Sequence, residues 1–302
     1  MATLDPLVTV KPSESVAVAP SANTVRRKIK RRFRRRLGYT PDLEHPRTYC
    51  EKVQWLKLNQ QGNDAKIIAR SDKYLVRNYI KENRLGQHLV KLYGVYEKPE
   101  EIDWQELPHR FVLKLNNASG PKYRWFAKEK STFPVSKFEV EARRRLSKKF
   151  GRKFGEFHYG KIPPKIIAEE YLEEDGKAIR DYKFYCFHGK CVFLSVEEGA
   201  AEGRNVMEYY NVEWEKHPVK FFDDYPRPHS SFSRPANLER MVSVAETLSQ
   251  GYPHLRVDLY CVNGHVFFGE LTYSPESGFI EWDPLSLDCE YGKLMDIKNI
   301  SH

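Results

Sequence analysis

The chain has 302 residues, of which 40% are hydrophobic and 30% charged, enough for a substantial core spread over two or three subdomains. No apolar run approaches the roughly 20 residues that a membrane-spanning helix needs, and no secretory signal is evident. The cysteines form no Cys-x-x-Cys pair, which predicts buried, reduced thiols in a cytoplasmic protein. They are Cys50, Cys186, Cys191, Cys261 and Cys289.

The formal net charge of +9 comes from one short segment. Arg26 to Arg36 holds nine basic residues and no acidic ones, and without it 41 Lys and Arg stand against 41 Asp and Glu. The rest of the chain is therefore neutral, and specific nucleic-acid recognition loses its electrostatic support.

Residues 1–24 are rich in Ser, Pro, Val and Ala and are expected to form a disordered arm. Residues 25–38 are predicted to form a basic amphipathic helix with one apolar stripe. This pattern is typical of a helix lying on an anionic membrane surface, where each basic residue contributes about 1 kcal/mol, and it suggests a peripheral location at the inner face of the membrane. The stripe could instead dock on the body, or the segment could bind nucleic acid non-specifically or stay a solvated arm. The stripe is Val25, Ile29, Phe33 and Leu37.

Residues 39–108 are predicted to form a small α/β subdomain. It would contain a helix over 49–58, a second helix capped by Ser71-Asp72 and a short strand over 93–96. The apolar face of the second helix would be Tyr74, Leu75, Tyr79 and Ile80. Lys73 and Arg77, one turn apart, could face a ligand, although solvent is the commoner outcome.

Residues 109–172 are expected to form a lid subdomain. A strand from Phe111 to Leu115 presents Lys114 and Asn116 on one side and then enters the small-residue loop 117–120. Such a loop can offer consecutive backbone N–H groups to a phosphate, with a lysine adding charge. Many loops of this kind bind nothing. A basic helix over 136–149 and a buried strand over 166–172, which contains Glu169-Glu170, complete the subdomain.

Residues 173–302 would form the C-terminal subdomain. A hairpin over 180–196 turns at His188-Gly189 and places Asp181 and Lys183 on one face, near the Glu169–Glu170 pair. These groups could form structural ion pairs or contact a ligand. Residues 235–251 read as a helix capped by Asn237, stopped by Gly251, with a core stripe of Leu238, Met241, Val242, Ala245 and Leu248.

A second hairpin, over 255–272, carries the main functional signal. A two-residue Asn263-Gly264 turn would place Asp258 and Glu270 on opposite faces of the sheet. A three-residue loop, with Gly264 as a bulge, would pair Arg256 with Glu270 and gather all the polar side chains on one face. We therefore predict the three-residue loop, because a shift of one residue in the register would mix polar and apolar side chains on both faces of the hairpin. The polar face would hold Arg256, Asp258, Glu270 and Thr272.

Two neighbouring carboxylates repel unless a cation lies between them. Mg²⁺ is the cation commonly found in such a position, where one or two carboxylates bind it and phosphate oxygens and water complete its coordination. An Arg–Asp–Glu ladder on the surface of an antiparallel sheet is the alternative.

Six segments in this order resemble the TupA-like ATP-grasp family, which is associated with teichuronopeptide and capsular polysaccharide biosynthesis. They are EKVQWLKL, SDKYLVRNYI, FVLKLNNASG, IIAEEYL, RDYKFYCFHGK and RVDLYCVNGHVFFGELTYSPESGF. The resemblance implies an α+β, ATP-grasp fold, with the nucleotide held between a small antiparallel lid subdomain and a C-terminal α+β subdomain. The cofactors would be ATP and Mg²⁺.

The resemblance also implies residue roles. Asp258, Glu270 and Thr272 would hold Mg²⁺, although an Asn is usual where Thr272 stands, and Ala118 makes the loop less permissive than Gly. Arg256 and Lys183 would be catalytic, and residues 274–279 would line the acceptor side. ATP would be contacted by Lys114, Asn116, Ser119, Gly120, Glu169, Glu170, Tyr171, Leu172 and Asp181.

The implied activity is a carboxylate–amine ligase that forms an amide through an acylphosphate. Its substrates would be a uronic acid of a bacterial surface glycan and an amino acid or amine. A glycosyltransferase of the same polysaccharides and a non-catalytic module for anionic surfaces are the alternatives. The sequence leaves the oligomeric state open.

Overall fold

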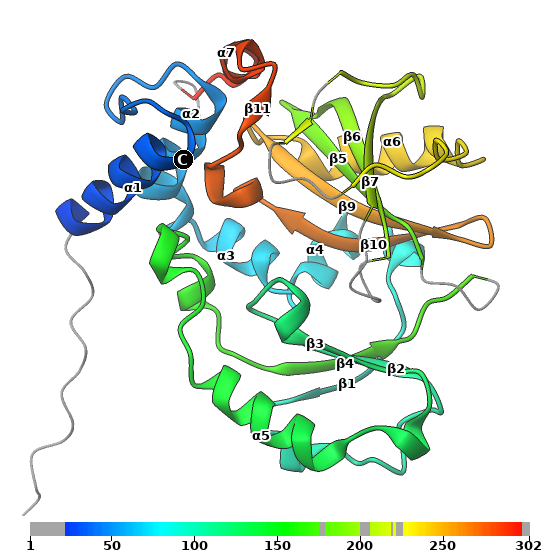
Figure 1. Cartoon of the computed structure of the whole chain (residues 1–302). Helices are drawn as coiled ribbons and strands as arrows, with labels where there is room; N and C mark the ends of the chain where they lie inside the picture. Colours follow the sequence, from blue (N-terminus) through cyan, green and yellow to red (C-terminus); the bar gives the residue numbers. More distant parts are fainter. Residues whose placement is uncertain (1–21, 175–178, 200–205, 219, 222–225, 298–302) are drawn as a thin grey trace, which may run out of the picture.

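A computed structural model describes residues 22–174, 179–199, 206–218, 220–221 and 226–297. The disorder expected for residues 1–24 lies outside these ranges, except that residues 22–24 belong to the first helix, so the expectation is wrong there. Within the described residues, the strands form two larger antiparallel sheets and one two-stranded ribbon. The two larger sheets lie at opposite ends of the molecule, and two short helices, α3 (Ala65–Ser71) and α4 (Val76–Glu82), lie between them (Figure 1).

The four-stranded sheet has the order β1-β4-β2-β3 and carries α5 on one face (Figure 1). Its elements are β1 (Leu92–Tyr96), β2 (Phe111–Leu115), β3 (Arg124–Ala127), β4 (Ile166–Glu170) and α5 (Val135–Leu146). Phe138 and Ala142 of α5 are buried in a core with Phe111 and Leu113 of β2. Because β1 pairs with β4, this sheet extends beyond the predicted lid boundaries of 109–172.

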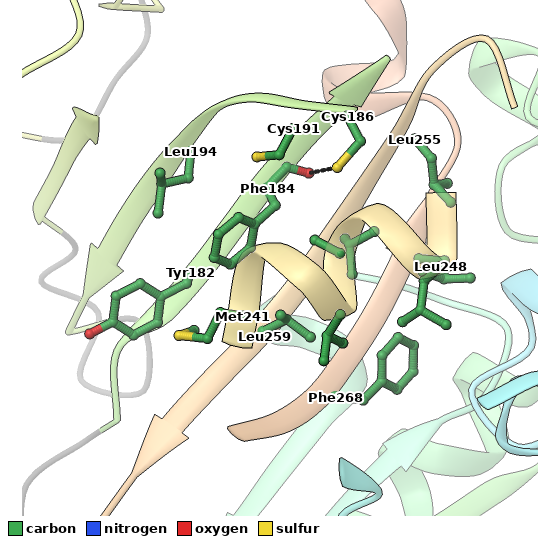
Figure 2. Packing of buried hydrophobic residues seen from close by; sticks show 14 of the residues in the cluster. Tyr182, Phe184, Cys186, Cys191, Leu194, Met241, Leu248, Leu255, Leu259 and Phe268 are labelled. Atoms are coloured by element: carbon green, nitrogen blue, oxygen red, sulfur yellow. Dashed lines mark hydrogen bonds between the residues drawn. The ribbon is translucent and has the colours of Figure 1, made fainter. Parts of the chain in front are cut away.

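The five-stranded sheet has the order β10-β9-β5-β6-β7, and α6 covers one face. Its elements are β5 (Asp181–Phe187), β6 (Lys190–Glu198), β7 (Val206–Asn211), β9 (Leu255–Val262), β10 (His265–Thr272) and α6 (Leu238–Ser249). Figure 2 shows Met241 and Leu248 of α6 packed among the alternate residues of β5 and β9. The predicted stripe is confirmed except at Val242, which is only partly buried, while Val244 is buried. Asn237 precedes α6, but its amide donates to the Gly264 carbonyl instead of capping the helix.

The remaining elements are α1 (Ala22–Arg36), α2 (Tyr49–Leu56), α7 (Ser286–Leu294), β8 (Lys220–Phe221), β11 (Trp282–Asp283) and short helical turns. The π-helical turn η1 (Lys57–Gln61) continues α2, where the sequence predicted one helix to Leu58. The 3₁₀ turns are η2 (Gly86–His88), η3 (Pro99–Glu101), η4 (Pro121–Tyr123), η5 (Lys130–Thr132), η6 (Arg152–Phe154), η7 (Tyr159–Lys161) and η8 (Pro275–Gly278).

The apolar stripe of α1 is buried against the body of the protein. Val25 and Ile29 are each 2% exposed and Phe33 is fully buried, in a core that α2, α7 and one end of the five-stranded sheet share. The Phe33 ring packs edge-on against Phe279 at 5.4 Å. The interpretation in which this stripe faces lipid is therefore wrong, and the docking alternative describes the arrangement. Of the helices described, none combines the length and the apolar character that crossing a membrane requires.

Three smaller expectations need correction. Tyr74 and Leu75 are exposed, so they do not belong to the apolar face of α4. The predicted cap at Ser71-Asp72 is also wrong for α4: Asp72 Oδ1 accepts from the backbone of Tyr74 at 2.7 Å in the turn before the helix, whereas the N-cap position of α4 is Leu75, which makes no side-chain cap hydrogen bond. Cys289 is exposed on α7, whereas Cys50, Cys186 and Cys191 are buried as predicted and Cys261 is partly buried.

Two buried histidines make the fold sensitive to acid. Burial lowers the pKa of His158 and of His254 from 6.5 to about 3. The unfolded chain therefore binds protons that the folded chain does not between these values, so stability is complete above pH 6.5 and falls as the pH drops toward 3. His254 contacts Tyr49 and the Cys186 carbonyl, each at 2.9 Å. Among the described residues neither ring nitrogen of His158 has a hydrogen-bond partner.

We expect His158→Leu to retain its stability at neutral pH, since no described hydrogen bond is lost. It should also remove about 2 kcal/mol of the stability loss between pH 6.5 and roughly pH 5, because each pH unit is worth about 1.4 kcal/mol per proton. Urea unfolding at both pH values measures this. An unchanged pH dependence would show that His158 is not held neutral.

Candidate active site

The 255–272 hairpin has a two-residue turn, so the predicted three-residue loop is wrong. Asn263 and Gly264 adopt φ values of 49° and 75°, and Val262 pairs directly with His265. The register then shifts between Phe268 and Glu270, so that Glu270 lies opposite Asp258 and Thr272 opposite Arg256. The extra residue needed to gather the polar side chains on one face is Gly269, in the strand rather than in the turn.

Gly269 leaves no space for a side chain. A Cβ atom there would lie 2.9 Å from the Asp258 carbonyl oxygen and 3.3 Å from the Tyr260 ring. We expect Gly269→Ala to displace β10 from β9, to destabilise the fold by about 1–3 kcal/mol and to separate Glu270 from Asp258. Thermal unfolding and ATP turnover measure the two effects. Gly86→Ala is the matched control, because its Cβ would meet only the Lys81 side chain at 3.5 Å. Equal behaviour of the two variants would contradict the role given to the bulge.

Arg256 is the centre of the polar face that the bulge creates. Its guanidinium donates to both carboxylate oxygens of Asp258 at 2.7 Å. One guanidinium nitrogen, Nη2, also reaches the Thr272 hydroxyl at 3.1 Å and Glu270 Oε1 at 3.5 Å. The structure thus brings together the four residues predicted from this hairpin.

Lys183 joins the same face from the neighbouring strand β5, where it pairs with Asp258 across the sheet. Its ammonium group contacts Asp181 and lies 2.7 Å from Glu197 Oε2. The predicted proximity of Asp181 and Lys183 is confirmed. The proximity to Glu169 and Glu170 is wrong, since those residues lie on the other sheet, and Glu197 of β6 takes their place.

Burial and charge act differently on the two facing carboxylates. Burial raises the pKa of Asp258, which is 4% exposed, to about 6 despite Arg256. Burial also disfavours ionised Glu270, but Lys73 and Arg256 outweigh it and lower the pKa of Glu270 to about 2. Glu270 is a quarter exposed, so it is the more accessible of the two carboxylates.

Lys73 connects the two sheets and was not among the predicted site residues. Its ammonium group lies 2.9 Å from Glu270 Oε2 and donates to the Ala118 carbonyl at 2.8 Å. Its backbone N–H donates to the Asn116 carbonyl at 3.0 Å. Lys73 therefore ties the small-residue loop 117–120 to the acidic pair. The signal that the sequence offers for Lys73 is its spacing one turn before Arg77, and this spacing is equally typical of two solvent-facing residues.

Lys114 lies on the four-stranded sheet in a second charged group. Its ammonium group is 2.8 Å from Glu169 Oε2, and Arg77 of α4 lies 3.4 Å from Glu169 Oε1. Glu169 is 9% exposed and Lys114 21%, so the acid is enclosed and the lysine is accessible. Glu169 thus holds the two cations and does not extend toward solvent.

The other predicted ATP contacts lie in and beside these strands. The buried Asn116 amide donates to the Pro163 carbonyl and accepts from the Lys165 N–H, so it fixes the start of the loop. Gly120 is exposed with φ 93° and Ser119 is partly buried. Three partly buried residues at the end of β4 also remain candidates, namely Glu170, Tyr171 and Leu172.

The loop after β10 is held in an unusual backbone conformation. Glu276 and Ser277 have positive φ values of 48° and 54°, which cost energy in residues other than glycine. Glu156 anchors the loop by accepting from the Ser274 and Ser277 hydroxyls at 2.8 and 2.9 Å. Buried Lys57 donates to the Ser277 carbonyl at 2.7 Å. This predicted acceptor loop thus begins two residues beyond Thr272, at the edge of the charged group.

The two antiparallel sheets, with a lysine and a small-residue loop on one and facing acids on the other, define an ATP-grasp protein. The sequence model of the TupA-like ATPgrasp family matches residues 51–296, and the chain belongs to this family. ATP-grasp proteins are carboxylate–amine ligases that bind ATP, typically with Mg²⁺. Among curated proteins, none matches the sequence.

Several solved structures are similar to this chain. D-alanine–D-alanine ligase from Helicobacter pylori is 15% identical, with 82% of this chain and 69% of that chain covered and a TM-score of 0.49. The Bacillus anthracis enzyme complexed with ATP is 15% identical, with 81% and 69% covered and a TM-score of 0.45. A RimK domain ATP-grasp protein from Sphaerobacter thermophilus is 9% identical, with 89% and 94% covered and a TM-score of 0.44. Similarity at this level carries no information about the substrate.

The donor set fits Mg²⁺ bound together with a nucleotide. Within the described residues, four carboxylates on this face meet the cationic side chains of Lys73, Lys183 and Arg256. Asp181 Oδ1 is buried and has no hydrogen-bond partner there. No three acidic, His or Cys side chains among these residues converge as a complete metal site. Mg²⁺ characteristically takes one or two carboxylates and fills its remaining positions with phosphate oxygens and water.

Proposed function

We propose that this protein is an ATP-dependent carboxylate–amine ligase that releases ADP and phosphate. Its carboxylate substrate would be a uronic acid of a bacterial surface or capsular polysaccharide, and its amine an amino acid or a related compound. The observation that carries the reaction class is the placement of Asp258 opposite Glu270, with Arg256 between them and Lys73 beside them. The resemblance to proteins of polysaccharide biosynthesis supports the substrate class.

The nucleotide would lie between the sheets. Lys114 and the backbone N–H groups of loop 117–120 would contact the phosphates, and Lys73 would hold this loop near Glu270. The backbone of Tyr171 and Leu172, together with Glu170, would contact the adenine. Asp258 and Glu270, aided by the Thr272 hydroxyl, would hold Mg²⁺, which neutralises phosphate charge during phosphoryl transfer.

In the first step, an oxygen of the substrate carboxylate attacks the γ-phosphorus in line, the bond to the β,γ-bridging oxygen breaks and ADP leaves. Arg256 and Lys183 stabilise the negative charge that spreads over the transferred group. In the second step, the amine attacks the acylphosphate carbonyl, the carbon–oxygen bond breaks, phosphate leaves and the amine loses a proton. Arg256 would stabilise the transient oxyanion.

The loop of η8 would bind the acceptor. Strained backbone conformations cluster at binding sites because the surrounding structure must enforce them. Here Glu156 and Lys57 hold the loop through hydrogen bonds of 2.7–2.9 Å to Ser274 and Ser277. The exposed Glu276 carboxylate would repel both ATP and a carboxylate substrate, so this side suits the cationic amine.

Mass spectrometry tests the proposal. The purified protein is incubated with ATP, Mg²⁺, uronic-acid glycans and a mixture of amino acids. We expect a condensation product lighter by one water than its two components, formed in step with ADP. Consumption of nucleotide sugars without release of ADP would establish a glycosyltransferase instead and overturn the ligase proposal.

A further inference from the structure

The basic residues of α1 divide into two groups once the helix is docked. Three of them face the body: Arg26 pairs with Glu44 at 2.5 Å, Arg36 with Glu281 at 2.5 Å, and Arg32 stacks 4.3 Å from the Phe154 ring centre. The other six are exposed, and none has an acidic partner among the described residues. They are Arg27, Lys28, Lys30, Arg31, Arg34 and Arg35.

The exposed group lies on the side of the helix opposite the buried stripe. At about 100° per residue, the six side chains spread over an arc of about 160°, whose centre points directly away from Val25, Ile29 and Phe33. The helix lies at the margin of the molecule (Figure 1). The adjoining turn η6 packs against α1 and adds exposed Lys153.

We propose that this exposed face of α1 binds an anionic lipid surface by charge alone, without inserting into the bilayer. The face is a half-cylinder about 22 Å long, so a planar surface can reach the basic residues along its length. The only aromatic residue of α1, Phe33, is fully buried, so the face lacks the stacking surface typical of single-stranded nucleic-acid sites. Because Val25, Ile29 and Phe33 pack on the core, the described part of α1 has no large apolar side chain left to enter the acyl region.

Vesicle sedimentation with the full chain tests this inference. We expect binding to phosphatidylcholine vesicles that contain phosphatidylglycerol and no binding to phosphatidylcholine alone. Binding should disappear between about 0.1 M and about 1 M salt, as the Debye length falls from about 10 Å to about 3 Å. Retention at high salt would instead indicate insertion of the stripe and overturn the proposal, as would a wild-type chain that stays in the supernatant.

A pair of variants distinguishes binding through this face of α1 from binding through the overall positive charge of the protein. Replacing Arg27, Lys30, Arg31 and Arg35 with Gln should lower the partition coefficient on the order of a thousandfold, since each of the four basic residues contributes about 1 kcal/mol and about 1.4 kcal/mol is a factor of ten. The control replaces four other exposed basic residues with Gln, around the four-stranded sheet, and should bind like the wild type; these are Lys98, Lys128, Lys137 and Arg144. Equal losses in both variants, or tighter binding to dextran sulfate than to vesicles, would overturn the proposal. Circular dichroism confirms that both variants are folded.

Discussion

Replacing Asp258 with Asn or Glu270 with Gln should abolish ATP turnover, with a loss on the order of a thousandfold. Each substitution removes one of the two carboxylates that face each other across β9 and β10. It also leaves the charge on the face more positive, so free ATP should still bind while the preference for ATP with Mg²⁺ is lost. Calorimetric titration of ATP with and without Mg²⁺, together with ADP release, measures both effects.

Glu270→Gln is the more informative of the two, because Arg256 then keeps its two bonds of 2.7 Å to Asp258. Asp288→Asn provides the matched control. Asp288 is 2% exposed and accepts from the Cys50 N–H and the Tyr39 hydroxyl, between α2 and α7. This control should lose stability and retain its turnover per folded molecule. Turnover that survives Glu270→Gln would refute the assignment of the metal site.

Replacing Lys73 with Met should produce the second largest effect. The change removes the ion pair with Glu270 at 2.9 Å and the bond to the Ala118 carbonyl at 2.8 Å. The loop 117–120 then loses its tie to the acidic pair, and Glu270 loses its nearest cation. We expect turnover to fall by about a hundredfold, the size of effect seen when one charge-stabilising donor is removed, and the affinity for ATP to fall with it.

Lys81→Met is the control for this prediction, because Lys81 is exposed on α4 and has no described ion pair. Lys73→Arg should recover part of the activity, since the charge returns without the same reach. A Lys73→Met variant with the kinetics of Lys81→Met would show that Lys73 only braces the loop.

The hairpin shows how far sequence patterning reaches. Arg256 and Asp258 are two residues apart, as are Glu270 and Thr272, and this spacing correctly indicated that these side chains share one face. The same argument required one extra residue, and it placed that residue in the turn. Asn263-Gly264 forms the two-residue turn that its composition favours, and Gly269 provides the bulge. Because side chains alternate between the two faces of a strand, the sequence shows that one extra residue is needed somewhere in the hairpin. Where that residue lies depends on the close contact between β10 and β9.

The charged contacts between residues of different elements could not be predicted from the sequence. Lys73 precedes α4 in a segment with ordinary helical spacing, and only the packing of α4 between the sheets brings it to Glu270. Glu197 lies on β6, and only the antiparallel order of β5 and β6 brings it to Lys183.

The sequence by itself determined the alternation of each strand, the turn at His188-Gly189, the core stripe of α6 and the basic character of α1, because these depend on neighbours along the chain. The tertiary structure decided that the stripe of α1 faces the core and not lipid, that β1 joins the four-stranded sheet, and that Lys73 meets Glu270. Those contacts join residues far apart in the chain, and their partners are selected by the space and charge that the packed sheets leave available.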